Sequence, residues 1–497
     1  MGRVAFRRTA RWPEATIAAM MLWLAPITAS AQTFTILHSF DGTDGNGSLA
    51  GLIQGTDGNL YGTTDLGGAH NGNGTVFKIT PGGVLTTLYD FCAQAACADG
   101  SEPRAGLVQG TDGNFYGTTY QGGSGCGGSG CGTLFKVTPA GLLTTLYDFC
   151  SATGCADGSG PDTALVQVSD GNFYGTTLKG GAAGFGTVFK ITPAGTLTTI
   201  YSFCALSGCA DGATPEGALV QGSNGDLYGT TYGGGLKSLG TAYKISPTGT
   251  LTTLYSFCSQ AQCPDGQLPV AGLVQATNGS FYGTTSGGGV NLQGTVYKTT
   301  PTGITRLYNF CSEAGCADGR TPYGTLIQGT DGNLYGNTLN GGLNNSCPNG
   351  CGTVFKISPN GVFTGFSGFC SASSCPYGQD PDGALLQDTN GKFYGTTSAG
   401  GANGHGAGTV YSFDMGFGPF VKPQPAAGSV GKTIVILGTN LVGATSVTFN
   451  GIPATFTVAG SGTAIRTTVP GGATTGPVQV VTPSGTLSSN VNFQVLP

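Results

Sequence analysis

GLVQGTDGNFYGTT, at residues 106–119, is one copy of a phrase that the chain carries seven times. Each copy places two apolar residues before a glutamine, then an Asp-Gly or Asn-Gly pair, then Phe or Leu before Tyr-Gly. The copies begin at Gly51, Gly106, Ala164, Ala218, Gly272, Thr325 and Ala384. Their tyrosines lie 53 to 59 residues apart, so the chain is a tandem array of one supersecondary unit.

Each unit divides into four short strands, called A to D here, which we expect in the second copy at 106–109, 114–118, 132–137 and 143–149. The Asp-Gly pair between A and B tolerates the positive φ of a tight hairpin, and Thr-Pro-x-Gly makes the C–D turn. A glycine-rich loop joins B to C, and a Cys-x4-Cys segment joins D to the next A. Four strands with this period are typical of a propeller blade.

The two ends of the array complement each other. The seventh unit supplies strands A, B and C, the last at 408–413, but no D strand follows. The sequence FTILHSF at 34–40 matches the D pattern and precedes the first A strand. Pairing of these segments would remove exposed strand edges. We therefore predict an all-β fold whose residues 32–415 form a seven-bladed β-propeller closed by the N-terminal strand.

Composition agrees with a turn-dense β protein that carries little charge. Glycine supplies 92 residues, charged residues make up 9% of the chain, and the net charge is −5. Such a chain has no basic face to neutralise phosphates, so we expect no nucleic-acid partner.

All 16 cysteines fall into close pairs, which predicts eight local disulfides in an oxidising compartment. Zinc is the alternative, but structural zinc sites usually use two-residue spacings or histidines, and the chain has only three histidines. The pairs are Cys92/Cys97, Cys126/Cys131, Cys150/Cys155, Cys204/Cys209, Cys258/Cys263, Cys311/Cys316, Cys347/Cys351 and Cys370/Cys375.

Residues 1–31 have the features of a secretory signal peptide. Four arginines precede a mostly apolar run at 17–27, and Ala-Ser-Ala at 29–31 is a small-residue cleavage pattern. A membrane anchor is the alternative, but the run is shorter than the roughly 20 residues needed to span a bilayer and contains Pro26. We expect export and no transmembrane segment in the mature chain.

Two resemblances to known families follow from these motifs. The repeat, with its later GTVFKITP and LTTLYDF phrases, resembles the bacterial GloVer tandem repeat, which implies an exported protein without an assigned activity. Residues 418–497 contain no cysteine, and GKTIVILGTNLVGATSVTFNG within them resembles an IPT/TIG domain. That resemblance implies an immunoglobulin-like β-sandwich, and alternating runs at 433–437, 446–449 and 478–481 independently predict strands.

In a propeller, the D–A and B–C loops share one face, and every cysteine pair lies in these loops. Long loops on a rigid scaffold are common binding sites, so this face is the candidate site. In five of the D–A loops, one aspartate stands before glycine and is a weak candidate for binding a metal, although Asp-Gly turns explain it better. These residues are Asp99, Asp157, Asp211, Asp265 and Asp318. The glutamine of each A strand is expected to satisfy backbone groups between blades.

Histidine gives the only indication of catalysis. His70 and His405 lie in B–C loops of the first and seventh units, and Glu102, Glu216 and Glu313 lie in D–A loops of the same face. An acid–base pair could form there, as in propeller lyases. No nucleophile elbow, metal triad or phosphate loop accompanies these residues.

The sequence therefore predicts an extracellular or cell-surface binding module, with a periplasmic location as the alternative, that recognises a glycan or a protein and needs no cofactor. Two other functions stay open. One is a propeller lyase or hydrolase acting on a polysaccharide or small molecule, and the other is a structural surface protein.

Overall fold

The computed structural model describes residues 2, 34–126, 130–300, 303–343, 347–370 and 375–496. The chain divides into two units, Met1–Gln32 and Thr33–Pro497. The predicted signal peptide at 1–31 lies outside the described residues except for Gly2.

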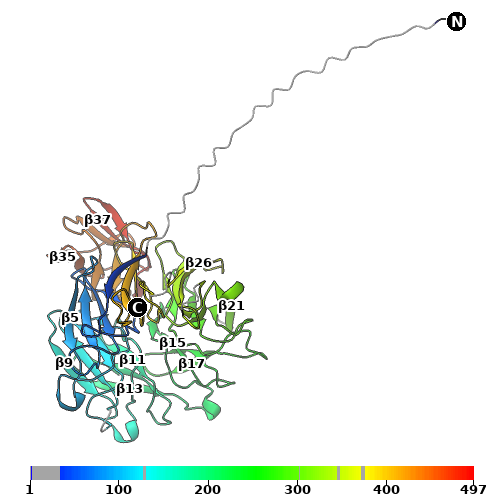
Figure 1. The fold of residues 1–497 in the computed structure, drawn as a ribbon. Helices are drawn as coiled ribbons and strands as arrows, with labels where there is room; N and C mark the ends of the chain where they lie inside the picture. The colour runs from blue at the N-terminus through cyan, green and yellow to red at the C-terminus, as the bar shows by residue number, and fades with distance from the viewer. Residues whose placement is uncertain are drawn as a thin grey trace. The chain divides into compact units, whose positions relative to one another are not determined.

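The repeats form seven separate antiparallel sheets, and the colour of the ribbon passes from blue to yellow through them (Figure 1). Six contain four strands, and the sixth repeat adds the short strand β22. The predicted four-strand unit is confirmed, with strand ends that differ from the expected ones by one or two residues. The strands are β2 (Ile53–Gln54), β3 (Leu60–Thr64), β4 (Thr75–Ile79) and β5 (Leu85–Asp90); β6 (Val108–Gln109), β7 (Phe115–Thr119), β8 (Thr133–Val137) and β9 (Leu143–Asp148); β10 (Val166–Gln167), β11 (Phe173–Thr177), β12 (Thr187–Ile191) and β13 (Leu197–Ser202); β14 (Val220–Gln221), β15 (Leu227–Thr231), β16 (Thr241–Ile245) and β17 (Leu251–Ser256); β18 (Val274–Gln275), β19 (Phe281–Thr285), β20 (Thr295–Thr300) and β21 (Gly303–Asn309); β22 (Arg320–Pro322), β23 (Ile327–Gln328), β24 (Leu334–Asn340), β25 (Thr353–Ile357) and β26 (Phe363–Gly368); and β27 (Leu386–Gln387), β28 (Phe393–Thr397) and β29 (Thr409–Phe413).

The N-terminal strand completes the seventh sheet. Strand β1 (Phe34–Ser39) pairs antiparallel with β29, and the sheet order is β1-β29-β28-β27. Phe34 lies opposite Phe413, and Ser39 lies opposite Thr409. The predicted pairing of the two ends of the array is therefore confirmed.

Aromatic and aliphatic side chains pack between successive sheets. The ring of Tyr116 in the second sheet packs against that of Phe173 in the third, with ring centroids 4.1 Å apart and ring planes tilted by 30°. Seven such cores join each sheet to the next. One of them joins Leu386 and Tyr394 of the seventh sheet to Leu52 and Leu60 of the first. The apolar contacts therefore run in a cycle through all seven sheets.

The D–A loops carry the short 3₁₀ turns η1 (Ala95–Cys97), η2 (Thr153–Cys155), η3 (Ser207–Cys209) and η4 (Ala314–Cys316). No helix in the described part of the chain combines the length and the apolar character needed to cross a membrane.

The C-terminal region is a β-sandwich, as predicted. Two four-stranded sheets, β30-β32-β36-β35 and β34-β33-β37-β38, enclose a core of twelve buried residues, and β31 pairs with β39. The strands are β30 (Lys422–Gln424), β31 (Ala427–Ser429), β32 (Thr433–Leu437), β33 (Ser446–Phe449), β34 (Ile452–Pro453), β35 (Phe456–Val458), β36 (Ala464–Thr468), β37 (Val478–Thr482), β38 (Gly485–Ser488) and β39 (Gln494–Leu496).

The sandwich contacts the A–B turns of the repeats. The Thr463 hydroxyl donates to the carbonyl of Thr56 at 2.6 Å, and the Arg466 guanidinium donates to the carbonyl of Thr111 at 2.9 Å. The Phe420 amide donates to the carbonyl of Thr389 at 3.0 Å. These contacts place the sandwich against the side of the sheets that carries the short turns.

Candidate functional site

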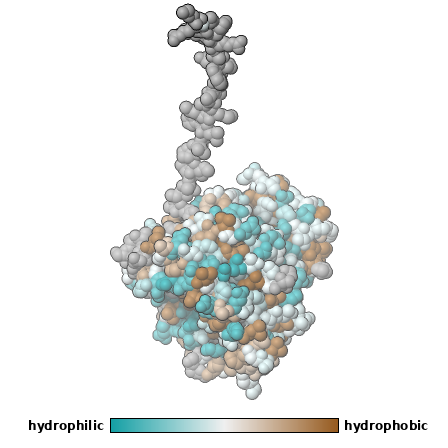
Figure 2. Space-filling model, turned by 90° about the vertical axis from the view of Figure 1, so that its right-hand side faces the viewer, coloured by the Kyte–Doolittle hydropathy of each residue, from teal (hydrophilic) through white to brown (hydrophobic). Residues whose placement is uncertain are grey.

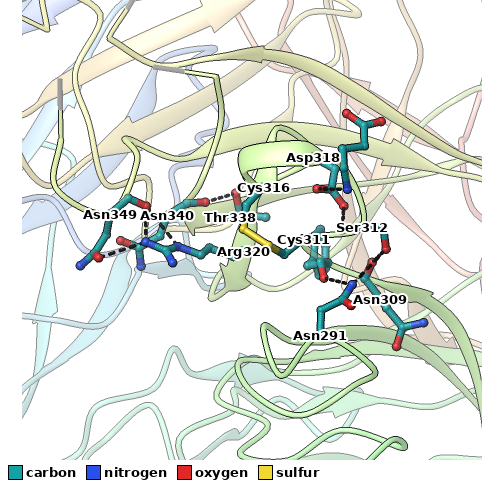
Figure 3. Close-up of a disulfide and its surroundings, with 12 residues drawn as sticks. Asn291, Asn309, Cys311, Ser312, Cys316, Asp318, Arg320, Thr338, Asn340 and Asn349 are labelled. Atoms are coloured by element: carbon teal, nitrogen blue, oxygen red, sulfur yellow. Dashed lines mark hydrogen bonds between the residues drawn. A yellow bond between two sulfur atoms is a disulfide. The ribbon is translucent and has the colours of Figure 1, made fainter. Parts of the chain in front are cut away.

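The D–A and B–C loops contact each other, as predicted. The amide of Gly123, in a B–C loop, donates to the carbonyl of Cys97 in the preceding D–A loop at 2.9 Å, and Gly342 donates to Cys316 in the same way. Figure 3 shows this arrangement around the Cys311–Cys316 disulfide, where Arg320 donates to the carbonyl of Asn349 in the next B–C loop at 2.8 Å. We call this loop surface the cystine face.

The structure contains all eight predicted disulfides and no free cysteine. In two repeats, a B–C disulfide lies beside a D–A disulfide. The four sulfurs of each group lie within 4.8 Å of one another: Cys126, Cys131, Cys150 and Cys155 in one, and Cys347, Cys351, Cys370 and Cys375 in the other. Among the described residues, no other His, Cys, Asp and Glu side chains converge in threes as metal ligands do.

Several cysteines of the cystine face are buried beneath the loop surface. Cys258 and Cys263 are each 8% exposed, so neither side chain is available to a ligand. The reason is that the next B–C loop folds over them, since the amide of Gly289 donates to the carbonyl of Cys263 at 2.9 Å. The other buried cysteines are Cys131, Cys347, Cys351, Cys370 and Cys375. These disulfides therefore support the loops from below.

The loop aspartates hold the turns rather than facing outward as free ligands. Asp318 is buried, and its carboxylate accepts the Tyr308 hydroxyl at 2.8 Å and the amides of Ser312 and Glu313 at 2.9 and 3.2 Å. The bonds of Asp318 and Ser312 are drawn in Figure 3. Equivalent partners engage both carboxylate oxygens of Asp99, Asp157 and Asp211. These hydrogen bonds are the ones that the turn interpretation leads us to expect.

The loop that contains Cys263 departs from this pattern. Pro264 follows Cys263, where four other D–A loops have alanine, and this loop contains no 3₁₀ turn. Asp265 still accepts the Tyr255 hydroxyl at 2.7 Å and the Ser259 amide at 2.8 Å. Its second carboxylate oxygen is buried without a partner among the described residues. The contacts of Asp265 with the Tyr255 hydroxyl and the Ser259 amide are those of a turn residue.

The repeated glutamines also have the predicted structural task. The side-chain carbonyl of Gln109 accepts the amide of Thr56 in the preceding A–B turn at 2.9 Å, and its side-chain amide donates to the carbonyl of Gly113. Gln387 bonds Thr330 in the same manner. Gln54 bonds Thr389, which links the first sheet to the seventh.

The structure does not assemble the predicted His/Glu pair. His70 and His405 are exposed, and Glu313 is exposed beside η4. Within the described residues, no hydrogen bond or ion pair joins a histidine to a glutamate. Glu102 instead binds the Arg104 guanidinium at 2.8 Å. Glu216 belongs to a different group of side chains.

That group lies where successive D–A loops reach the A strands. In each of six repeats, one residue follows a proline just before strand A, and five of the six are polar: Arg104, Asp162, Glu216, Tyr323 and Asp382. The charges of Asp162 and Arg104 interact, as do those of Glu216 and Asp162, and Tyr323 interacts with Asp162, Glu216 and Asp382. We call these five residues, with Asp65, Tyr120 and Tyr232 at the ends of B strands, the acidic–aromatic cluster.

Contacts within the cluster join different sheets. Arg104 donates to the Asp65 carboxylate at 3.2 Å, and its guanidinium lies 4.1 Å from the centre of the Tyr120 ring. Tyr323 is 40% exposed and Tyr232 is 38% exposed, so both rings reach solvent. Asp162 and Glu216 are half-buried and make no side-chain hydrogen bond to any described residue.

Burial changes the acidity of these carboxyl groups. Loss of water, together with the negative charge of Asp162, raises the pKa of Glu216 to about 7. Burial likewise raises the pKa of Asp382 to about 7 and that of Asp162 to about 6, although Arg104 lowers the latter. Near neutral pH, this cluster therefore combines carboxylates that accept hydrogen bonds with carboxylic acids that donate them.

Of the candidate residues predicted from the sequence, Glu216 belongs to the acidic–aromatic cluster and Glu102 lies beside it, bound to Arg104. The seven copies share their structural residues, whereas the residue after the proline varies between copies. This variation after the proline is the sequence signal that could have indicated the cluster. Residues that pack the sheets must be alike in every repeat, whereas residues that bind a ligand need not be.

The fold and the loops define a class: disulfide-rich, all-β repeat proteins with a candidate site built on loops. The chain belongs to the Gloeobacter/Verrucomicrobia repeat family, whose model matches residues 24–208, 126–274 and 258–449. An IPT/TIG domain matches residues 421–495. These matches confirm both resemblances drawn from the sequence. No curated protein gives a significant match.

Several solved structures are similar to this chain at low identity. A fungal alcohol oxidase of the AA5 family, in complex with copper, is 14% identical with a TM-score of 0.46, covering 94% of this chain and 99% of its own. A protein of unknown function from Dyadobacter fermentans is 11% identical (TM-score 0.40; coverage 76% and 96%). One from Bacteroides thetaiotaomicron is 13% identical (TM-score 0.39; coverage 77% and 76%). Likenesses of this size support no inference about activity.

Proposed function

We propose that this chain is an exported binding module that recognises a glycan through the acidic–aromatic cluster on its cystine face. In this proposal, residues 1–31 are a cleaved signal peptide, residues 32–415 are a seven-bladed β-propeller and residues 418–497 are an immunoglobulin-like spacer or docking domain. The cyclic order of the inter-sheet cores and the pairing of β1 with β29 support the propeller. The eight disulfides and the IPT/TIG domain are compatible with an extracellular location.

The observation that carries the proposal is the combination of two exposed tyrosine rings, Tyr232 and Tyr323, with half-buried carboxyl groups that make no side-chain hydrogen bond to any described residue. Sugars present hydroxyl groups that donate to carboxylates and apolar C–H faces that stack on aromatic rings. In a propeller, the start of each A strand lies near the central axis, so the varied side chains converge there. Figure 2 shows hydrophilic and hydrophobic residues interspersed over the face in view.

A glycan array followed by calorimetry tests the proposal. We expect the mature protein to bind a glycan, and Glu216→Gln and Tyr323→Ala each to weaken binding by about tenfold or more, which equals about 1.4 kcal/mol. Glu313→Gln is the matched control because Glu313 is exposed and lies outside the cluster. Unchanged affinity in both cluster variants would refute this assignment of the site, and binding of a protein instead would correct the ligand class.

The raised pKa of Glu216 favours one alternative, a glycan-cleaving hydrolase or lyase. A carboxyl with a pKa of about 7 is suited to act as a general acid near neutral pH. This alternative predicts turnover of the bound glycan that Glu216→Gln abolishes while binding persists. If His70→Ala or His405→Ala abolished turnover instead, the histidine-based site suggested by the sequence would be favoured.

A further inference from the structure

A partly open cavity lies between the A strands and the sandwich, on the side of the A–B turns. This cavity has a volume of about 500 Å³. Val108, Val166, Val220 and Val274, from four successive A strands, form one wall. The segment Lys422–Ala427 of the sandwich forms the opposite wall. Cavities of this size at a junction between two domains commonly hold small molecules.

The wall from the repeats is chemically apolar toward this space. Its glutamines are committed elsewhere, because Gln109, Gln167 and Gln275 bond backbone groups of the A–B turns. Their neighbours in the A strands are the valines, which present methyl groups. An occupant with an apolar body would remove this apolar surface from water, which favours binding.

The wall from the sandwich supplies the polar groups. Lys422 is the only charged residue of the lining, and Gln424 and Asn492 accompany it. Among the described residues, none of these three side chains makes a hydrogen bond or an ion pair within the usual distances. Burial lowers the pKa of Lys422, and the nearby Asp388 opposes this effect.

Asp388 does not neutralise the lysine by direct contact. It is 2% exposed, one of its oxygens accepts the Asn390 amide at 2.8 Å, and its other oxygen has no partner within the described chain. No ion pair joins it to Lys422 in the described residues. Lys422 therefore lines the cavity as a cation without a direct ion-pair partner among the described residues.

We propose that this cavity is a second binding site, for a small molecule that has an apolar body and a single carboxylate. The carboxylate pairs with Lys422 through charge-assisted hydrogen bonds, and the apolar body lies against the four valines. The site does not depend on the proposed glycan site, because the two share no residue.

Fluorescence of anilinonaphthalene sulfonate, an apolar anion, tests the proposal with the full mature chain. We expect one saturable site per chain, from which octanoate displaces the dye at least tenfold more effectively than octanol does. Lys422→Met should weaken dye and octanoate binding by about tenfold or more. Lys392→Met is the matched control, because Lys392 is exposed and pairs with Asp414 at 3.6 Å.

A second variant tests the location without changing charge. Val220→Phe fills part of the cavity and should abolish saturable dye binding while the midpoint of thermal unfolding stays within a few degrees of wild type. If Lys422→Met fails to fold, dye binding by Val220→Phe still tests the proposed site. Wild-type affinity in a folded Lys422→Met or Val220→Phe protein, equal displacement by octanol, or the absence of a saturable site would overturn the proposal.

Discussion

The repeats and the sandwich bury their apolar side chains in different ways. The sandwich encloses its own core, in which Ile434, Phe449 and Phe493 pack between two sheets of the same domain. A repeat sheet has no such interior, and its aromatic residues, such as Phe173, pack against a neighbouring sheet. Each repeat therefore depends on its neighbours, and the first and last depend on each other. We therefore expect a destabilising substitution in one repeat to lower the stability of all seven repeats. A destabilising substitution in the sandwich should affect the sandwich alone.

The largest expected effect comes from removing one core ring in each region. Phe173 is fully buried against Tyr116, and Phe449 is 1% exposed with its ring 5.1 Å from that of Phe493. Either alanine substitution should cost about 3–5 kcal/mol. Phe173→Ala should lower the unfolding temperature of all seven repeats together, and Phe449→Ala should destabilise the sandwich alone. Calorimetry with hydrogen exchange checks this, and loss confined to one or two repeats in Phe173→Ala would count against the comparison.

An intermediate effect is expected from opening one disulfide. Cys204 and Cys209 close a loop of only a few residues, so replacing both with serine should cost about 2 kcal/mol. We expect the loss to appear as faster proteolysis of the D–A loop around η3. The sandwich contains no cysteine and is the internal control. Equal acceleration of cleavage in the sandwich would show that the disulfide acts globally.

The smallest expected effect is a pH dependence from the acidic–aromatic cluster. The pKa of Glu216 is raised from 4.5 to about 7, so the folded state binds this proton more tightly than the unfolded chain does. The resulting stabilisation is full below about pH 4.5 and is lost as the pH rises to about 7. Glu216→Gln should flatten this decline by about 1 kcal/mol or less, because water partly screens the half-buried group.

Denaturant titrations at about pH 5 and about pH 8 measure the change, with Glu313→Gln as the control. If the free energy of unfolding fell with rising pH equally in the wild type and in Glu216→Gln, other titratable groups would be responsible for the pH dependence.

The sequence was sufficient to predict the repeats, the closing strand and the disulfides, because each of these follows from local patterns. Asp-Gly turns, alternation and cysteine spacing act over a few residues, and the missing D strand identified the partner of Phe34. The burial of Cys263 and the acidic–aromatic cluster required the structure. Asp162 and Tyr323, for example, are far apart in the chain, and the arrangement of the sheets brings them close enough to interact. The cavity beside Lys422 also required the structure, because its shape depends on how the sandwich contacts the A–B turns.

Hydrogen–deuterium exchange of the mature protein tests the cyclic arrangement most directly, by comparing the peptide that spans β1 with the one that spans β9. Both are the outermost strands of their sheets, and the account predicts protection of β1 similar to that of β9, with β29 protected alongside it. Exchange of the β1 amides within seconds, while β9 stays protected, would contradict the account.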